Sequence, residues 1–165
     1  MGSAASTSAA PSDPSAITAA TPGNNGLEVA PDDSGFYTIA FGWRAVAMFR
    51  RHATGGPYAV LPAPGFMPDN IHWDGKHLIA AGMVSDEPAC GGKRQIIDGV
   101  ADKMLCPRGW RVAELRPRSH QWRLIAQGPR SSVFNGVSSA VLNGRYLWLG
   151  SYQADRLAVT LRPLP

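Results

Sequence analysis

The sequence predicts an all-β protein built from short antiparallel strands. Short apolar runs, rich in aromatic and β-branched residues, alternate with turn residues at a spacing too tight for helices. The chain of 165 residues has 18 glycines and 14 prolines, which favours many turns over long helices. The first unit holds four such runs, and we expect strands at 26–30, 36–42, 44–51 and 58–63.

Two further units follow the first. In the second, "NIHW" and "HLIAAGM" flank an Asp-Gly turn, which is a strong hairpin signal. After an insertion at about 85–107, "GWRVAELRP" and "HQWRLIAQG" complete four strands. The third unit offers three strands, in "NGVSSAVL", "YLWLGSY" and "RLAVTLRP".

These units form a weak internal repeat whose strands open on Asn25, Asp69 and Asn135. The first interval is 69 − 25 = 44 residues, and the second is 135 − 69 = 66 because it contains the insertion. A period of roughly 40–45 residues with four strands is typical of a β-propeller blade. We therefore expect about three four-stranded blades over 24–165, half of a six-bladed propeller. The Ala/Ser/Pro-rich segment 1–23 is expected to be disordered.

Oxygen-bearing side chains at the strand openings have two interpretations. The innermost strand of each blade runs along the central channel, so Asn25, Asp69 and Asn70 would converge there as ligands of a hard cation. Asn and Asp are also ordinary turn residues, which bond their own backbone. The periodicity alone favours the turn interpretation.

Charge and cysteine content restrict the partners. The formal net charge is +4, but the arginines are scattered among acids, so we expect no nucleic-acid surface. The chain shows neither a membrane-spanning stretch nor a normal signal peptide, so we expect no membrane partner and the localisation stays open. Cys90 and Cys106 bracket a polar stretch and are either free thiols or a loop-closing disulfide.

Three motifs carry a family resemblance: "NGLEVAPDDSGFYTIAFGWRAVAMFRR", "PDNIHWDGKHLIAAG" and "NGVSSAVLNGRYLWLGSYQADRLAV". They resemble the superfamily of gluconolactonase, senescence marker protein and luciferin-regenerating enzyme, with the paraoxonases as a branch. The resemblance implies a six-bladed propeller that holds Ca²⁺ or another divalent cation and hydrolyses lactones or esters. It matches Asn25 and Asp69 to metal ligands, Asn70 to an additional ligand of the paraoxonase-like branch, and Asp69 to the catalytic general base.

The departures from that family matter as well. Its members are about twice as long, and the remaining metal ligands and the paraoxonase histidine dyad have no counterpart among His52, His72, His77 or His120. We therefore expect the C-terminal half of a lactone or ester hydrolase, weak or inactive alone. It would be either a fragment or a half-propeller that self-associates to complete the ring. The alternatives are a non-catalytic propeller used as a binding scaffold, or a strictosidine-synthase-like propeller, against which Asp69 and Asn70 argue.

Overall fold

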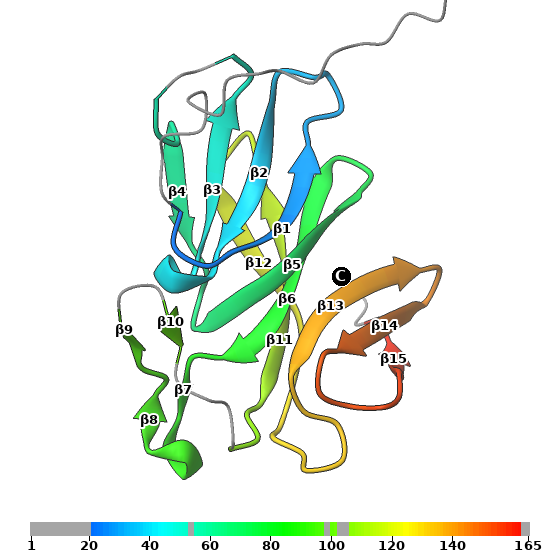
Figure 1. The fold of residues 1–165 in the computed structure, drawn as a ribbon. Coiled ribbons are helices and arrows are strands. Elements are labelled where there is room, and N and C mark those ends of the chain that lie inside the picture. Colours follow the sequence, from blue (N-terminus) through cyan, green and yellow to red (C-terminus); the bar gives the residue numbers. More distant parts are fainter. Residues whose placement is uncertain (1–20, 53–54, 98–99, 102–105, 163–165) are drawn as a thin grey trace, which may run out of the picture.

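Three larger antiparallel sheets and two small two-stranded ones make up the described part of the protein (Figure 1). The structure is a computed structural model that describes residues 21–52, 55–97, 100–101 and 106–162. Most of the segment expected to be disordered, residues 1–20, lies outside this description. Within the described part, the helical elements are two short 3-10 turns, so the all-β prediction is confirmed.

The first sheet is a four-stranded meander in the order β1-β2-β3-β4. Its expected strands are confirmed to within a few residues at each end. A 3-10 turn, η2 (Phe41–Trp43), connects the second strand to the third. The strands are β1 (Asn24–Val29), β2 (Gly35–Ala40), β3 (Ala45–Arg50) and β4 (Ala59–Pro62).

The second sheet has the order β12-β11-β6-β5, and the insertion lies between its second and third strands along the chain. Its strands are β5 (Phe66–Asp74), β6 (His77–Val84), β11 (Trp110–Arg116) and β12 (Gln121–Gly128). The insertion contains β7 (Asp86–Glu87), the 3-10 turn η3 (Pro88–Cys90), β8 (Gly92–Lys93), β9 (Ile96–Ile97) and β10 (Val100–Ala101).

The two cysteines form a disulfide that closes this insertion. Their Cα atoms lie 5.7 Å apart. Of the two alternatives left open by the sequence, the structure therefore has the loop-closing disulfide.

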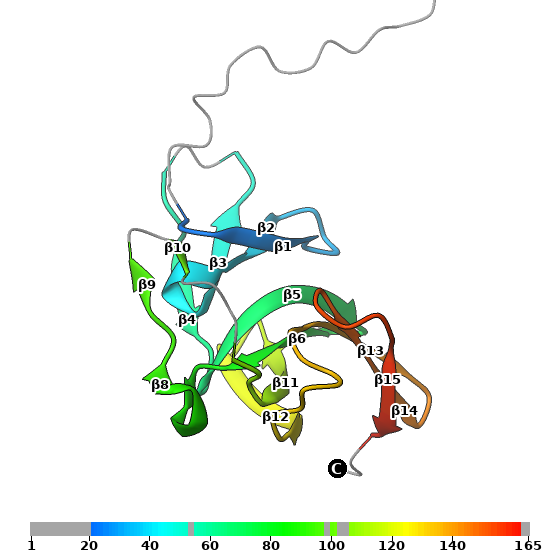
Figure 2. The same ribbon diagram turned by 60° about the horizontal axis from the view of Figure 1, so that its bottom comes forward.

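The third sheet has three strands in the order β13-β14-β15, as expected. They are β13 (Val137–Asn143), β14 (Tyr146–Ser151) and β15 (Ala158–Leu161). Figure 2 shows the three sheets side by side, with β5 between β1 and β13. The sheets thus stand as successive blades whose first strands are neighbours.

Most of the core lies between the blades, in two clusters on the two faces of the middle sheet, and a third, smaller cluster consists of Ala40, Ala47 and Phe49 of the first sheet. Leu78 and Ala80 of β6 pack with residues of the first sheet such as Met48. The alternate residues of β6, Ile79 and Ala81, pack with the third sheet. A strand buried on both faces needs an unbroken apolar run, which explains the sequence "LIAAGM". No helix in the described ranges is long and apolar enough to cross a membrane.

Candidate functional site

All three first strands carry a β-bulge near their beginnings. The pairing register shifts between Asn25 and Leu27 in β1, between Pro68 and Asn70 in β5, and between Val137 and Ser139 in β13. The bulged residues are therefore Gly26, Asp69 and Ser138. A bulge bends its strand and redirects a side chain, and here Asp69 and Ser138 both line the same pocket.

Asp69 is held by the two amides predicted to accompany it. Asn25 Nδ2 donates a hydrogen bond to Asp69 Oδ1 at 2.5 Å, and Asn70 Nδ2 lies 3.4 Å from the same oxygen. The backbone carbonyl of Asn25 accepts a hydrogen bond from the Thr38 hydroxyl at 3.1 Å, which fixes its place against β2. The structure thus brings Asn25, Asp69 and Asn70 together at the junction of two blades.

Glycine at position 26 permits this junction. A Cβ there would lie 2.8 Å from Asn70 Cα and 2.9 Å from Ile71 N, which is too close for any side chain. Only glycine therefore allows β1 to approach β5 closely enough for Asn25 to reach Asp69.

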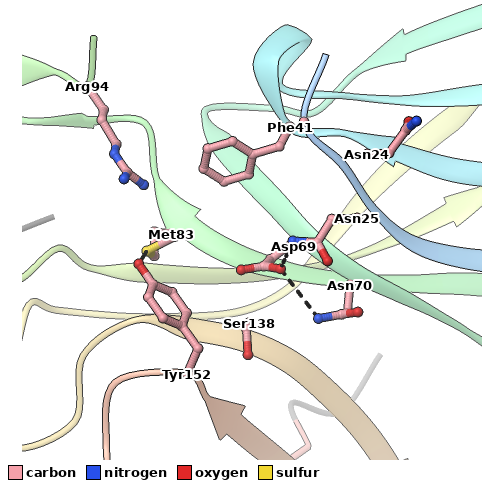
Figure 3. A pocket seen from close by; sticks show the side chains of 10 residues that line it. Asn24, Asn25, Phe41, Asp69, Asn70, Met83, Arg94, Ser138 and Tyr152 are labelled. Atoms are coloured by element: carbon pink, nitrogen blue, oxygen red, sulfur yellow. Dashed lines mark hydrogen bonds between the residues drawn. The ribbon is translucent and has the colours of Figure 1, made fainter. Parts of the chain in front are cut away.

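An open pocket of about 530 Å³ surrounds Asp69. Figure 3 shows Asn25 and Asn70 on one side of the Asp69 carboxylate and Arg94 and Tyr152 on the other. All three blades and the insertion contribute to the lining, which comprises Gly23, Asn24, Asn25, Phe41, Asp69, Asn70, Met83, Arg94, Ser138 and Tyr152.

Burial changes the acidity of the central carboxyl. Asp69 is only 8% exposed. Burial raises its pKa to about 6, against the opposing effect of the Arg94 positive charge. Asp69 is therefore mostly ionised at neutral pH and can still take up a proton near that pH.

Other residues considered from the sequence lie elsewhere. The Asn135 amide binds Gln153 and the backbone N–H of Arg108, at 2.6 and 3.1 Å, and Ser138 lines the pocket in its place. Asn135, the third residue named at a strand opening, therefore lies outside the pocket lining, because the β13 bulge falls three residues later. His72 Nδ1 faces Glu28 at 3.3 Å and His77 Nδ1 faces Glu114 at 3.4 Å, so both are structural in this fold.

Sequence reasoning missed four polar residues of the pocket, which are Asn24, Arg94, Ser138 and Tyr152. Arg94 comes from the insertion, and Tyr152 follows β14. Burial raises the Tyr152 pKa, Arg94 lowers it and Asp69 raises it, so both charges act on its hydroxyl. No periodic signal marks Arg94, because the insertion interrupts the repeat.

The fold resembles that of solved proteins. The chain matches the proposed 6-phosphogluconolactonase of Bacteroides fragilis NCTC 9343 with a TM-score of 0.51 and 14% identity, over 84% of this chain and 35% of that one. It also matches a proposed 6-phosphogluconolactonase of Bacteroides uniformis ATCC 8492 (TM-score 0.41, 14% identity, 82% and 49% coverage). A Lactobacillus plantarum protein matches with a TM-score of 0.40 and 16% identity, over 86% and 51%.

The structure has a β-propeller fold with three blades. The chain spans about a third to a half of the length of these solved structures. No protein-family model matches it, and no curated protein matches it significantly. The likeness therefore concerns the fold, and the gluconolactonase superfamily remains a resemblance in sequence motifs.

The donor set at Asp69 fits a hard cation. It offers a carboxylate, the two amides of Asn25 and Asn70, and the hydroxyl of Ser138, all oxygen donors of the kind that Ca²⁺ takes. An amide presents its oxygen in place of its nitrogen after half a turn about its last bond. The described residues contain no group of three or more His, Cys, Asp or Glu side chains that could hold a metal. Any cation here would rest on one acid and neutral oxygens.

Proposed function

We propose that the chain carries part of the site of a lactone or ester hydrolase that depends on Ca²⁺ or another divalent cation. The supporting observation is the buried Asp69 carboxylate, which is held by Asn25 and Asn70 where two blades meet in an open pocket. Asn25, Asp69 and Asn70 would hold the cation. When bound, the cation would polarise a carbonyl and lower the pKa of a water molecule.

Asp69 is the proposed general base. Without the cation, burial raises its pKa to about 6, so the carboxylate is mostly ionised at neutral pH and can bind the cation or accept a proton. Asn25 and Asn70 hold the carboxylate through hydrogen bonds to Oδ1 when no cation is bound, and would turn their amide oxygens toward the cation when it binds. The pocket beside it, of about 530 Å³, has room for a small lactone or ester.

Two resemblances favour a lactone as substrate. The three sequence motifs point to a superfamily of lactone and ester hydrolases. The fold resembles that of a Bacteroides fragilis protein proposed to be a 6-phosphogluconolactonase, of which this chain covers 35%. Because the fold alone does not fix the reaction, the proposal rests on Asp69 and its neighbours.

We further propose that a second copy of the chain completes the ring. Asn25, Asp69 and Asn70 offer three oxygen ligands, whereas Ca²⁺ takes six to eight. A two-fold pair would bring the same three residues of both copies to one axis and close the ring. Exposed apolar residues on the outer faces of the first and third blades, such as Leu27 (62%) and Val141 (54%), would be covered in that pair.

Calorimetry with Ca²⁺ and hydrolysis of a simple lactone, with and without a chelator, test the proposal. Asp69→Asn should weaken Ca²⁺ binding by roughly a hundredfold and abolish hydrolysis, because it removes the one charge of the donor set. Asn25→Ala should weaken binding less, by roughly tenfold, since it removes a neutral ligand. The control is Asp74→Asn, at the other end of β5. Equal Ca²⁺ affinity for wild type and Asp69→Asn would leave only the turn-residue interpretation, and Ca²⁺ binding without hydrolysis would favour a binding scaffold.

A further inference from the structure

Arg94 places a positive charge on the wall of the pocket opposite Asn25 and Asn70, and its backbone is held by hydrogen bonds. Arg94 is 8% exposed and lines the pocket, although it belongs to the inserted segment. Its backbone N–H donates to the Ser85 carbonyl at 3.1 Å, and its carbonyl accepts from Arg44 Nη2 at 2.8 Å. The arginine is thus fixed through both of its backbone polar groups.

The side chain of Arg94 is also ordered by packing. Its Cζ atom lies 5.5 Å from the centre of the Phe41 ring, a cation–π distance. The Cys90–Cys106 disulfide closes the segment that contains it. An arginine that is already ordered loses little side-chain entropy when it binds a ligand, so it is well suited to recognition.

Tyr152 brings a second polar group to the same wall. Figure 3 shows its hydroxyl on the Arg94 side of the pocket, across from Asn70, where it lies 3.8 Å from Met83 Sδ. The positive charge of Arg94 lowers the pKa of both Asp69 and Tyr152, so it acts across the pocket. A guanidinium fork and a phenolic O–H together match the two oxygens of a carboxylate.

We propose that Arg94 and Tyr152 form a carboxylate-binding subsite, and that the pocket therefore takes ligands with a carboxylate at one end and hydroxyl groups at the other. The inference deepens the proposed function and rests on it for the cation at Asp69. A divalent cation there neutralises Asp69 and leaves the pocket positively charged, which favours an anionic ligand. Hydroxycarboxylates, the open forms of lactones, have this chemistry.

The probe is gluconate, and sorbitol is its neutral match, with the same carbon chain and no carboxylate. Calorimetry on the full chain saturated with Ca²⁺ should show gluconate binding and no sorbitol binding. Arg94→Gln should weaken gluconate binding by roughly thirtyfold, and Tyr152→Phe by roughly fivefold, because each removes part of the subsite. Neither variant should weaken Ca²⁺ binding. Arg50→Gln, which loses an exposed arginine stacked on Tyr58, is the matched control and should behave as wild type.

Equal gluconate affinity in wild type and in both subsite variants would overturn the inference, as would equal affinity of wild type for gluconate and sorbitol. If Arg94→Gln does not fold, Arg94→Lys and Tyr152→Phe give the same test, and the lysine should retain part of the affinity through its charge. A wild type that binds gluconate through Arg94 but shows no Ca²⁺ binding in calorimetry would retain the subsite and refute the cation at Asp69. Failure of the two proposals is therefore distinguishable.

Discussion

Asn25 and Asp69 are joined by a hydrogen bond of 2.5 Å across two blades, and 44 residues of sequence separate them. Two other contacts between β1 and β5 have the same separation: Glu28 with His72, and the Val29 carbonyl with the Trp73 indole N–H. These three contacts show that each residue of β1 lies beside the residue of β5 that is 44 positions later in the chain. The sequence repeat therefore matches the alignment of the two strands. The candidate site stands at the beginning of this register, where both strands are bulged.

Gly26 is the residue on which this register depends. Gly26→Ala would place a Cβ 2.8 Å from Asn70 Cα, so β1 has to move away from β5 and Asn25 loses contact with Asp69. We expect a loss of about 2 kcal/mol in the free energy of unfolding. Ca²⁺ binding should fall as far as in Asn25→Ala. Denaturant titration and calorimetry measure the two effects.

The matched control for this substitution is Gly55→Ala. A Cβ at Gly55 meets nothing within 4 Å, so this variant should keep the wild-type stability and Ca²⁺ affinity. If Gly26→Ala binds Ca²⁺ as tightly as Gly55→Ala does, the close approach of the two strands has no role in the site.

The raised pKa of Asp69 predicts a stability that depends on pH. The unfolded carboxyl has a pKa of 3.8 and the folded one about 6, so the folded state binds the proton more tightly. Above pH 6, the buried charge of Asp69 lowers the free energy of unfolding by its full amount. As the pH falls from 6 toward 4, Asp69 takes up a proton and this destabilisation disappears. Asp69→Asn removes that cost while keeping an oxygen that can accept from Asn25. It should stabilise the chain by about 2 kcal/mol at neutral pH, a figure reduced for the part of the carboxylate that faces the open pocket.

Thermal unfolding in the presence of a chelator, at about pH 8 and about pH 4, measures this effect. The gain in Tm from Asp69→Asn should be large at the higher pH and nearly absent at the lower one. The control Asp74→Asn should show no gain at either pH. A gain of the same size at both values would mean that burial of the charge is not its cause.

The sequence predicted the blades because strand patterning is local. Each hairpin is set by alternating apolar residues and by turns such as Asp74–Gly75, and these can be read without the rest of the chain. Strand β6 of the middle blade can also be recognised from the sequence, because it is apolar on both faces and forms a continuous apolar run. What the sequence could not show is where each bulge falls, since a bulge depends on pairing with the next strand. The repeat therefore indicates Asn135 at the third strand opening, whereas Ser138 occupies the bulge.

Only part of the candidate site could be predicted from the sequence, for a similar reason. Asn25, Asp69 and Asn70 follow the repeat and were predicted to converge, which they do. Arg94 reaches the pocket through a disulfide-closed insertion that has no counterpart in the other two blades. Its position is a consequence of the tertiary fold, and periodicity has no information about it.

The Cys90–Cys106 disulfide should stabilise the insertion and order Arg94. The bond closes a loop with a sequence separation of 16, for which chain entropy suggests about 3 kcal/mol of stabilisation. The double variant Cys90→Ser, Cys106→Ser should therefore unfold at lower denaturant concentration. It should bind gluconate less tightly and bind Ca²⁺ as wild type does, because Asp69 lies on β5 outside the loop. Unchanged gluconate affinity in a folded double variant would show that the backbone contacts of Arg94 to Ser85 and Arg44 suffice.

Self-association should depend on the outer face of the third blade. Val141, Trp148 and Val159 are direct cross-strand partners on β13, β14 and β15, and they are 54%, 41% and 51% exposed. They share one face because directly opposed residues point to the same side of a sheet.

Trp148→Asp places a charge at the centre of this row of three residues and should shift the chain from dimer to monomer in light scattering after gel filtration. It should also weaken Ca²⁺ binding, since the second set of oxygen ligands is then lost. Trp43→Asp is the matched control, because Trp43 is also 41% exposed but lies on η2. A wild type that is monomeric at every concentration tested, or a Trp148→Asp variant that still dimerises, would exclude this face as the contact between copies.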